Sequence, residues 1–100
     1  MPKIELSVPH QLSREDVKSR IVRSLAEAQK RFAGDVTQVA DSWNGYVDEF
    51  SFKAMGFSIA GRLEVEPAQV AIHLQLPWAA YPFKHRIESE ILAHARQLLA

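Results

Sequence analysis

The chain has no cysteine, and this absence removes several kinds of chemistry at once. Without thiols there can be no disulfide, no thiolate nucleophile and no cysteine-ligated zinc or iron–sulfur centre. The sequence also lacks an apolar run long enough for a signal peptide or a transmembrane helix. We therefore expect a cytoplasmic protein with no transmembrane segment.

The sequence has no excess of either charge, since 12 Lys and Arg residues balance 12 Asp and Glu residues. A neutral chain has no general attraction to nucleic acid or to an anionic membrane. The glycines at 34, 45, 56 and 61 are dispersed rather than clustered before a helix, which excludes the usual phosphate-binding loops. A Gly-x-Ser-x-Gly nucleophile motif is also missing. We expect no catalytic residue, no enzyme activity and no obligatory cofactor.

The length bounds the architecture. One hundred residues, 47% of them hydrophobic, can bury a single core but not two. We expect a single domain over residues 1–100.

Alternation of apolar and polar residues predicts about five strands. The alternation is clear at residues 3–8, 57–66 and 70–76, and weaker at 39–43 and 46–54. In the 46–54 segment Phe50 and Phe52 share a face. Asn44 and Gly45 between the two weaker strands predict a type I′ hairpin turn.

Two further segments have the spacing of amphipathic helices. Ser13 followed by Asp16 resembles a capping box before the first, and Pro82 fits the first turn of the second. The inward positions of the first are Val17, Ile21, Leu25, Ala28 and Phe32. Those of the second include Phe83, Ile87, Ile91, Ala95 and Leu98. The order β-α-β-β-β-β-α predicts an α+β fold, an antiparallel β-sheet of about five strands with two amphipathic helices packed on one face.

The histidines are the candidate transition-metal ligands, and their placement argues against a shared site. His85 and His94 are nine residues apart on the last helix and point to opposite sides. Glu90 and His94 share a face, but His94 falls within the apolar stripe, which favours a satisfied histidine at the core boundary. His73 lies on the polar face of its strand, and His10 follows a strand in a loop. We expect no metal site.

The first helix is the most basic segment, so nucleic-acid binding has to be weighed. Its charges are spaced for ion pairs at i,i+4, which favours a solvated, self-paired face. The expected pairs are Asp16–Arg20, Arg23–Glu27 and Glu27–Arg31. Residues 35–76 contain six acids against two bases, so we expect the open face of the sheet to lean acidic. The acids are Asp35, Asp41, Asp48, Glu49, Glu64 and Glu66. We expect no nucleic-acid partner.

The connection at residues 77–83, Pro-Trp-Ala-Ala-Tyr-Pro-Phe, is the most unusual segment because connections this apolar are uncommon on a monomer surface. Either it caps the end of the core, or it docks onto a hydrophobic surface, a lipid-like ligand or a second subunit. Trp43 at the hairpin either joins the same patch or packs under the first helix. The candidate docking residues are Trp78, Tyr81, Phe83 and Trp43.

Several motifs along the chain resemble one known family. They are Pro2-Lys3-Ile4, Pro9-His10, Ser13-Arg14-Glu15, Trp43-x-Gly45 with Phe50 and Phe52, Gly61-x-Leu63-x-Val65, and Lys84-x-x-Ile87-Glu88-x-Glu90-Ile91. Together they resemble the polyhydroxyalkanoic acid system proteins, also called the polyhydroxyalkanoate granule region family, over essentially the whole chain. The resemblance implies a small bacterial cytoplasmic protein whose genes tend to lie near those for polyester storage granules. It implies no defined activity and supplies no catalytic or binding residue.

Three functions remain open. The first is a non-enzymatic accessory or binding protein at the storage-granule surface, which docks a hydrophobic surface or an acyl-type ligand and has the granule or granule-associated proteins as partners. The second is an RNA- or ribosome-associated small α+β factor, since the element order also suits double-stranded-RNA-binding-like folds. The third is a helix-grip-like lipid-binding or cyclase-like protein. Exposed strand edges and the apolar connection leave monomer and homodimer equally open.

Overall fold

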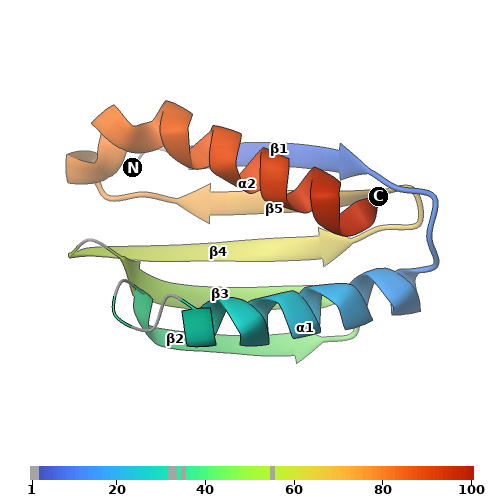
Figure 1. The fold of residues 1–100 in the computed structure, drawn as a ribbon. Coiled ribbons are helices and arrows are strands. Elements are labelled where there is room, and N and C mark those ends of the chain that lie inside the picture. Colours follow the sequence, from blue (N-terminus) through green and yellow to red (C-terminus); the bar gives the residue numbers. More distant parts are fainter. Residues whose placement is uncertain (1–2, 32–33, 35, 55) are drawn as a thin grey trace.

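The computed structural model describes residues 3–31, 34, 36–54 and 56–100, with the backbone alone at 28 and 31 (Figure 1). In this part of the chain five strands form one antiparallel sheet, and two α-helices lie on the same face of it. The elements follow the predicted order β-α-β-β-β-β-α, so the α+β fold is confirmed.

The order of strands in the sheet explains why a helix follows the first strand. The strands are β1 (Lys3–Pro9), β2 (Val36–Asn44), β3 (Val47–Ala54), β4 (Phe57–Val65) and β5 (Gln69–Gln75). They lie in the order β1-β5-β4-β3-β2, so β1 and β2 form opposite edges. Because every neighbouring pair is antiparallel, β1 and β2 run in the same direction. The chain therefore has to return across the sheet between them, and α1 (Arg14–Arg31) makes this crossing.

The strand register brings the apolar faces together beneath the helices. Ile4 on β1 is opposite Leu74 on β5, and Leu63 on β4 is opposite Ile72. The core formed in this way also takes Val17 from α1, together with residues of α2 (Lys84–Leu99). The predicted apolar faces of β1, β4 and β5 are confirmed.

The start of α1 follows its sequence signal. The Asp16 backbone N–H donates to the Ser13 hydroxyl at 3.1 Å, as the capping pattern predicts. Val17 and Ile21 are buried, whereas Leu25 is 39% exposed. The side chains of the other two predicted inward positions, Ala28 and Phe32, lie outside the described residues. The apolar stripe of α1 is thus only partly covered.

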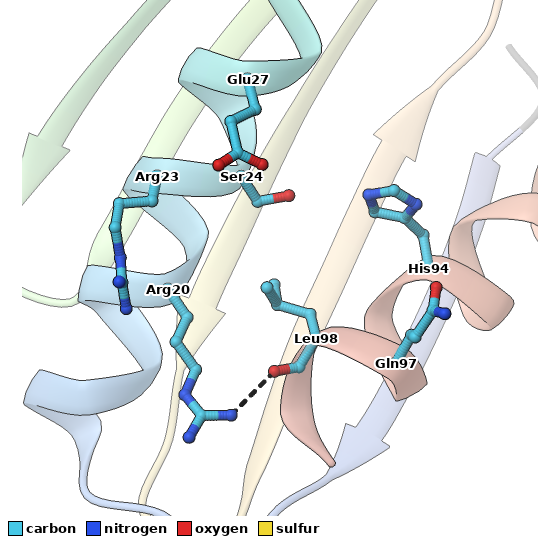
Figure 2. Close-up of a pocket in the computed structure, with 7 residues that line it drawn as sticks. All are labelled: Arg20, Arg23, Ser24, Glu27, His94, Gln97 and Leu98. Carbon is cyan, nitrogen blue, oxygen red and sulfur yellow. Dashed lines mark hydrogen bonds between the residues drawn. The ribbon is translucent and has the colours of Figure 1, made fainter.

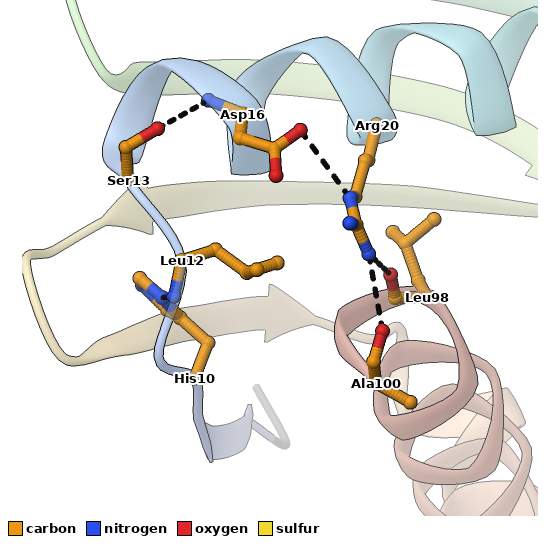
Figure 3. Close-up of polar contacts among 7 residues, drawn as sticks. All are labelled: His10, Leu12, Ser13, Asp16, Arg20, Leu98 and Ala100. Carbon is orange, nitrogen blue, oxygen red and sulfur yellow. Dashed lines mark hydrogen bonds and ion pairs between the residues drawn. The ribbon is translucent and has the colours of Figure 1, made fainter.

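Arg20 ties the two helices together at one end. Its Nε lies 3.4 Å from the Asp16 carboxylate, which is the predicted ion pair. Its Nη1 donates to the Leu98 carbonyl at 3.1 Å (Figure 2) and to the Ala100 carbonyl at 3.2 Å (Figure 3). Carbonyls at a helix C-terminus lack partners within the helix, so a cation there satisfies them and also complements the helix dipole.

The other two ion pairs predicted on α1 are not observed among the described side chains. Arg23 and Glu27 form no ion pair within 4.0 Å, although both side chains are described. The Glu27–Arg31 pair involves a side chain outside the described part.

The β2–β3 hairpin differs from the prediction in its turn. Asn44 pairs with Val47, so the two turn residues are Gly45 and Tyr46 rather than Asn44 and Gly45. Gly45 has φ +63° and Tyr46 has no positive φ. A positive φ at the first turn position alone is typical of type II′, not of the predicted type I′.

The connection before the last helix also differs from the prediction. Trp78–Phe83 forms a short 3₁₀ helix, η1, and α2 begins at Lys84. Pro82 therefore lies inside η1 and not in the first turn of α2.

Candidate docking site

The η1 segment turns its small side chain inward and its large aromatic side chains outward. Ala80 is fully buried, and its N–H donates to the Pro77 carbonyl at 2.9 Å. Trp78 is 69% exposed, Tyr81 55% and Phe83 42%. We call these three residues the aromatic patch. Ala80 is thus the residue that enters the core, while the aromatic rings lie at the surface.

Ring contacts hold the aromatic patch in place. The centroids of Trp78 and Tyr81 are 6.4 Å apart, and those of Phe83 and Phe57 are 6.3 Å apart, with tilted rings in both pairs. Both separations are in the range of favourable aromatic pairs. Phe57 starts β4 and packs against the core, so one end of the patch rests on the sheet.

A run of basic residues follows the aromatic patch directly. Lys84, His85 and Arg86 occupy the first turn of α2, which contains no acidic residue. The helix dipole disfavours cations at this end. Glutamates one turn later compensate in part: Glu88 lies 4.0 Å from Lys84, and Glu90 lies 3.4 Å from Arg86. The placement costs local helix stability, which makes it notable beside an exposed apolar surface.

Trp43 does not lie with the other three candidate residues. It is half-buried near the end of β2, and the Lys18 ammonium of α1 lies 4.8 Å from the centre of its ring. Lys18 also donates to the Gly45 carbonyl at 2.7 Å. Figure 1 shows η1 and this hairpin at opposite ends of the sheet. Of the two alternatives for Trp43, the structure selects packing under the first helix.

Further contacts fix α1 on the hairpin. The Tyr46 hydroxyl donates to Glu15 at 2.9 Å, and the Arg14 guanidinium lies 4.3 Å from the centre of the Tyr46 ring. Hydrogen bonding by its own backbone N–H and by Tyr46 lowers the pKa of Glu15, and the bond to Glu15 raises the pKa of Tyr46. Three cations of α1, at positions 14, 18 and 20, are therefore engaged within the molecule.

Sequence reasoning missed a buried acid. Asp48 is fully buried on the helix-covered face of β3, and its carboxyl oxygens have no hydrogen-bond partner of good geometry among the described residues. Burial, and then the neighbouring Asp41 carboxyl, raise the pKa of Asp48 from 3.8 to about 7, while the Ser42 amide and Lys18 act in the opposite direction. The sequence does indicate this burial, because Asp48 lies two residues before Phe50 in the same strand and therefore points to the same face of the sheet.

The expectation of an acidic open face is therefore wrong in two of its acids. Asp41 is opposite Phe50 in the register, so Asp41 and Asp48 both belong to the helix-covered face. Asp35 lies outside the described residues. Glu64 does lie on the open face, where it pairs with Arg62 at 3.0 Å.

The histidines serve different roles. His10 follows β1 in a loop, as expected, but it is buried, and the Leu12 N–H donates to its Nδ1 at 3.1 Å. The proton therefore sits on Nε2, 2.8 Å from the Glu66 carbonyl. His94 is exposed rather than at the core boundary, and faces α1 (Figure 2). Within the described ranges, His, Asp and Glu residues form no cluster of three suited to a metal ion.

The fold and the patch define a small α+β protein with an exposed aromatic surface at one end of the sheet. Residues 4–99 match the family described as "Putative polyhydroxyalkanoic acid system protein". The match covers nearly the whole chain, so the protein belongs to this family. No curated protein matches the sequence. Among the helices that the structure describes, none is long and apolar enough to span a membrane.

Proposed function

We propose that this protein is a non-enzymatic accessory protein that docks onto the hydrophobic surface of polyhydroxyalkanoate storage granules through the aromatic patch. The observation that carries the proposal is the outward display of Trp78, Tyr81 and Phe83 from a short helix whose Ala80 is buried. The family description supports the polyester context. Trp and Tyr side chains suit such a surface because each combines an apolar ring with a polar atom that stays in water.

The exposed area sets the strength of docking. Three aromatic side chains of roughly 200 Å² each, a little more than half exposed, offer about 330 Å² of surface. Covering half of that area at about 25 cal/mol per Å² contributes about 4 kcal/mol, which corresponds to a dissociation constant of about 1 mM. One patch alone therefore supports reversible attachment, and many copies on one granule would add avidity.

The basic start of α2 would add to this attraction if the granule surface carries anionic head groups. Each Lys or Arg near an anionic lipid surface contributes about 1 kcal/mol, an effect that salt screens. Lys84 and Arg86 lie directly after the patch and are placed for this role. Their contribution predicts a salt-dependent part of binding on top of a salt-independent aromatic part.

The test is co-sedimentation of the protein with purified polyester granules. The test variant is Trp78→Gln/Tyr81→Gln, which leaves Phe83 on Phe57 to protect folding. The matched control is Val22→Gln, which removes a 45% exposed apolar side chain on α1. We expect the double variant to bind at least tenfold more weakly and the control to bind like the wild type. A wild type that stays in the supernatant, or a folded double variant that binds normally, would overturn the proposal.

The proposal of an RNA- or ribosome-associated factor finds less support. The cations of α1 at 14 and 18 contact Tyr46 and Trp43, so they are committed to the fold. Phosphate binding needs cations that can leave their partners. Unchanged migration of structured RNA at low salt is the expected result.

A further inference from the structure

A second feature, independent of the aromatic patch, is a groove between α1 and α2. Figure 1 shows the helices on different parts of the sheet with β4 between them, and α1 contacts β2 and β4 while α2 contacts β1. The groove has two levels. The lower level, about 390 Å³, is mainly apolar, and the upper level, about 440 Å³, is mainly polar. Ser24, His94 and Leu98 line both levels, so the two are continuous.

The lower level is an apolar trough over the sheet. Leu63 and Ile72 form its floor, Leu25 lies on the α1 side, and Ile91 and Ala95 lie on the α2 side. Leu25 is 39% exposed although it belongs to the inward stripe of its helix. The trough is thus mainly apolar, core-facing surface that neither helix covers, with Glu90, the ion-pair partner of Arg86, on its α2 side.

The upper level places two guanidinium groups and an imidazole ring above this trough. Arg20, Arg23 and His94 line it, with Glu27 as the acid among its lining residues (Figure 2). Arg20 uses Nε for Asp16 and Nη1 for two carbonyls, which leaves the N–H donors of Nη2 for a further acceptor. A planar guanidinium held in place in this way suits a carboxylate.

We propose that the groove binds a carboxylic acid with a linear alkyl chain, such as a medium-chain fatty acid. The chain lies in the trough on Leu63 and Ile72, and the carboxylate lies among Arg20, Arg23 and His94. The site does not depend on the aromatic patch. The combined chemistry of apolar floor and cationic rim selects an amphipathic anion over a neutral hydrocarbon.

The geometry also selects a thin ligand over a protein segment. An α-helix with its side chains is about 10–12 Å across. Arg20 spans the two helices at one end of the groove and would obstruct a helix laid along it. A single alkyl chain fits these limits, and a second copy of this protein inserting a helix does not.

The test uses octanoate, 1-octanol and acetate as probes, below micelle-forming concentrations, with binding followed by NMR titration of the whole chain. We expect saturable binding of octanoate with shifts at Ser24 and Ile91 and not at Trp78. We expect about tenfold weaker binding of 1-octanol, because it lacks the charged hydrogen bonds, and no saturable binding of acetate. Equal affinity for octanoate and 1-octanol, or shifts centred on η1, would overturn the assignment.

Variants test the trough and the rim separately. Ala95→Phe fills the trough and should weaken octanoate at least tenfold, whereas Ala93→Phe, at an exposed position of α2, should not. Arg23→Gln with His94→Gln should weaken octanoate while leaving 1-octanol unchanged. Trp78→Gln/Tyr81→Gln should retain octanoate binding, so loss of granule docking and loss of acid binding are distinguishable. If Ala95→Phe fails to fold, the residues whose NMR signals shift when octanoate binds to the wild type show whether the ligand lies in the groove. A folded Ala95→Phe with normal affinity, or a dimer that this substitution disrupts, refutes the site.

Discussion

Asp48 makes the stability of the protein depend on pH in an unusual direction. Most carboxyls have a lower pKa in the folded state, whereas the pKa of Asp48 is raised from 3.8 to about 7. Between these values the folded protein keeps the proton and the unfolded chain releases it. The unfolded state therefore binds fewer protons, and the free energy of unfolding falls as pH rises from about 4 to above 7.

The size of the effect follows from the shift. About three pKa units correspond to about 4 kcal/mol at 1.36 kcal/mol per unit. Part of the shift comes from Asp41, which is exposed and whose charge is screened by water, so we expect about 2–4 kcal/mol. Asp48→Asn keeps the shape of the side chain and removes the titration. At pH 4 the variant should match the wild type within about 1 kcal/mol, and at pH 8.5 it should be more stable by the full amount.

Urea unfolding at several pH values measures this difference. Trp43 is the cross-strand neighbour of Asp48, so its fluorescence reports on this part of the sheet. All other groups are the same in both proteins, so the difference between the two profiles isolates Asp48. Asp41→Asn should flatten the wild-type profile in part, and Glu49→Gln, next in sequence but on the open face, should not change it. Parallel profiles for wild type and Asp48→Asn between pH 4 and 8.5 would refute the reasoning.

Three further substitutions test the packing. Gly61→Ala should destabilise the fold by about 1–3 kcal/mol in urea unfolding, because an added Cβ would lie 2.6 Å from the His73 carbonyl and 2.7 Å from the Phe50 ring. His10→Ala should lower the free energy of unfolding by about 1–3 kcal/mol, since two hydrogen bonds with backbone groups in a part-buried site are lost. Arg20→Met should cost about 1–2 kcal/mol and speed amide exchange in the last turn of α2. A Gly61→Ala protein as stable as the wild type, or unchanged exchange in Arg20→Met, would contradict these contacts.

Periodicity predicted most of the fold because most segments expose one face and bury the other. β1, β4 and β5 and the order of elements follow from it, as does the Ser13 cap. β2 was harder, since it starts at Val36 and carries a bulge between Thr37 and Ala40, with Gln38 at φ +53°. A bulge shifts the alternation by one residue, so a period of two no longer identifies the buried face.

The hairpin turn and the start of α2 depend on local geometry that composition does not determine. Asn-Gly favours a type I′ turn, but the register of β2 on β3 moved the turn to Gly45 and Tyr46. Pro82 predicted the first turn of the last helix, whereas it lies inside the preceding 3₁₀ helix η1. In both places the pairing of larger elements decided between local conformations of similar energy.

The candidate sites show where periodicity has a physical limit. An apolar stripe predicts which face of a helix turns away from water. It does not predict whether a neighbouring element covers the whole of that face. Leu25 follows the same pattern as Val17 and Ile21, yet it is 39% exposed because it lines the groove between α1 and α2. The aromatic patch has the same origin, since η1 needs only Ala80 to close the core. Both proposed sites consist of apolar side chains that the fold does not cover. Exposed apolar surface lowers the solubility of a small domain, so its presence favours a binding role. The two sets of variants, in the patch and in the groove, test that inference at each site separately.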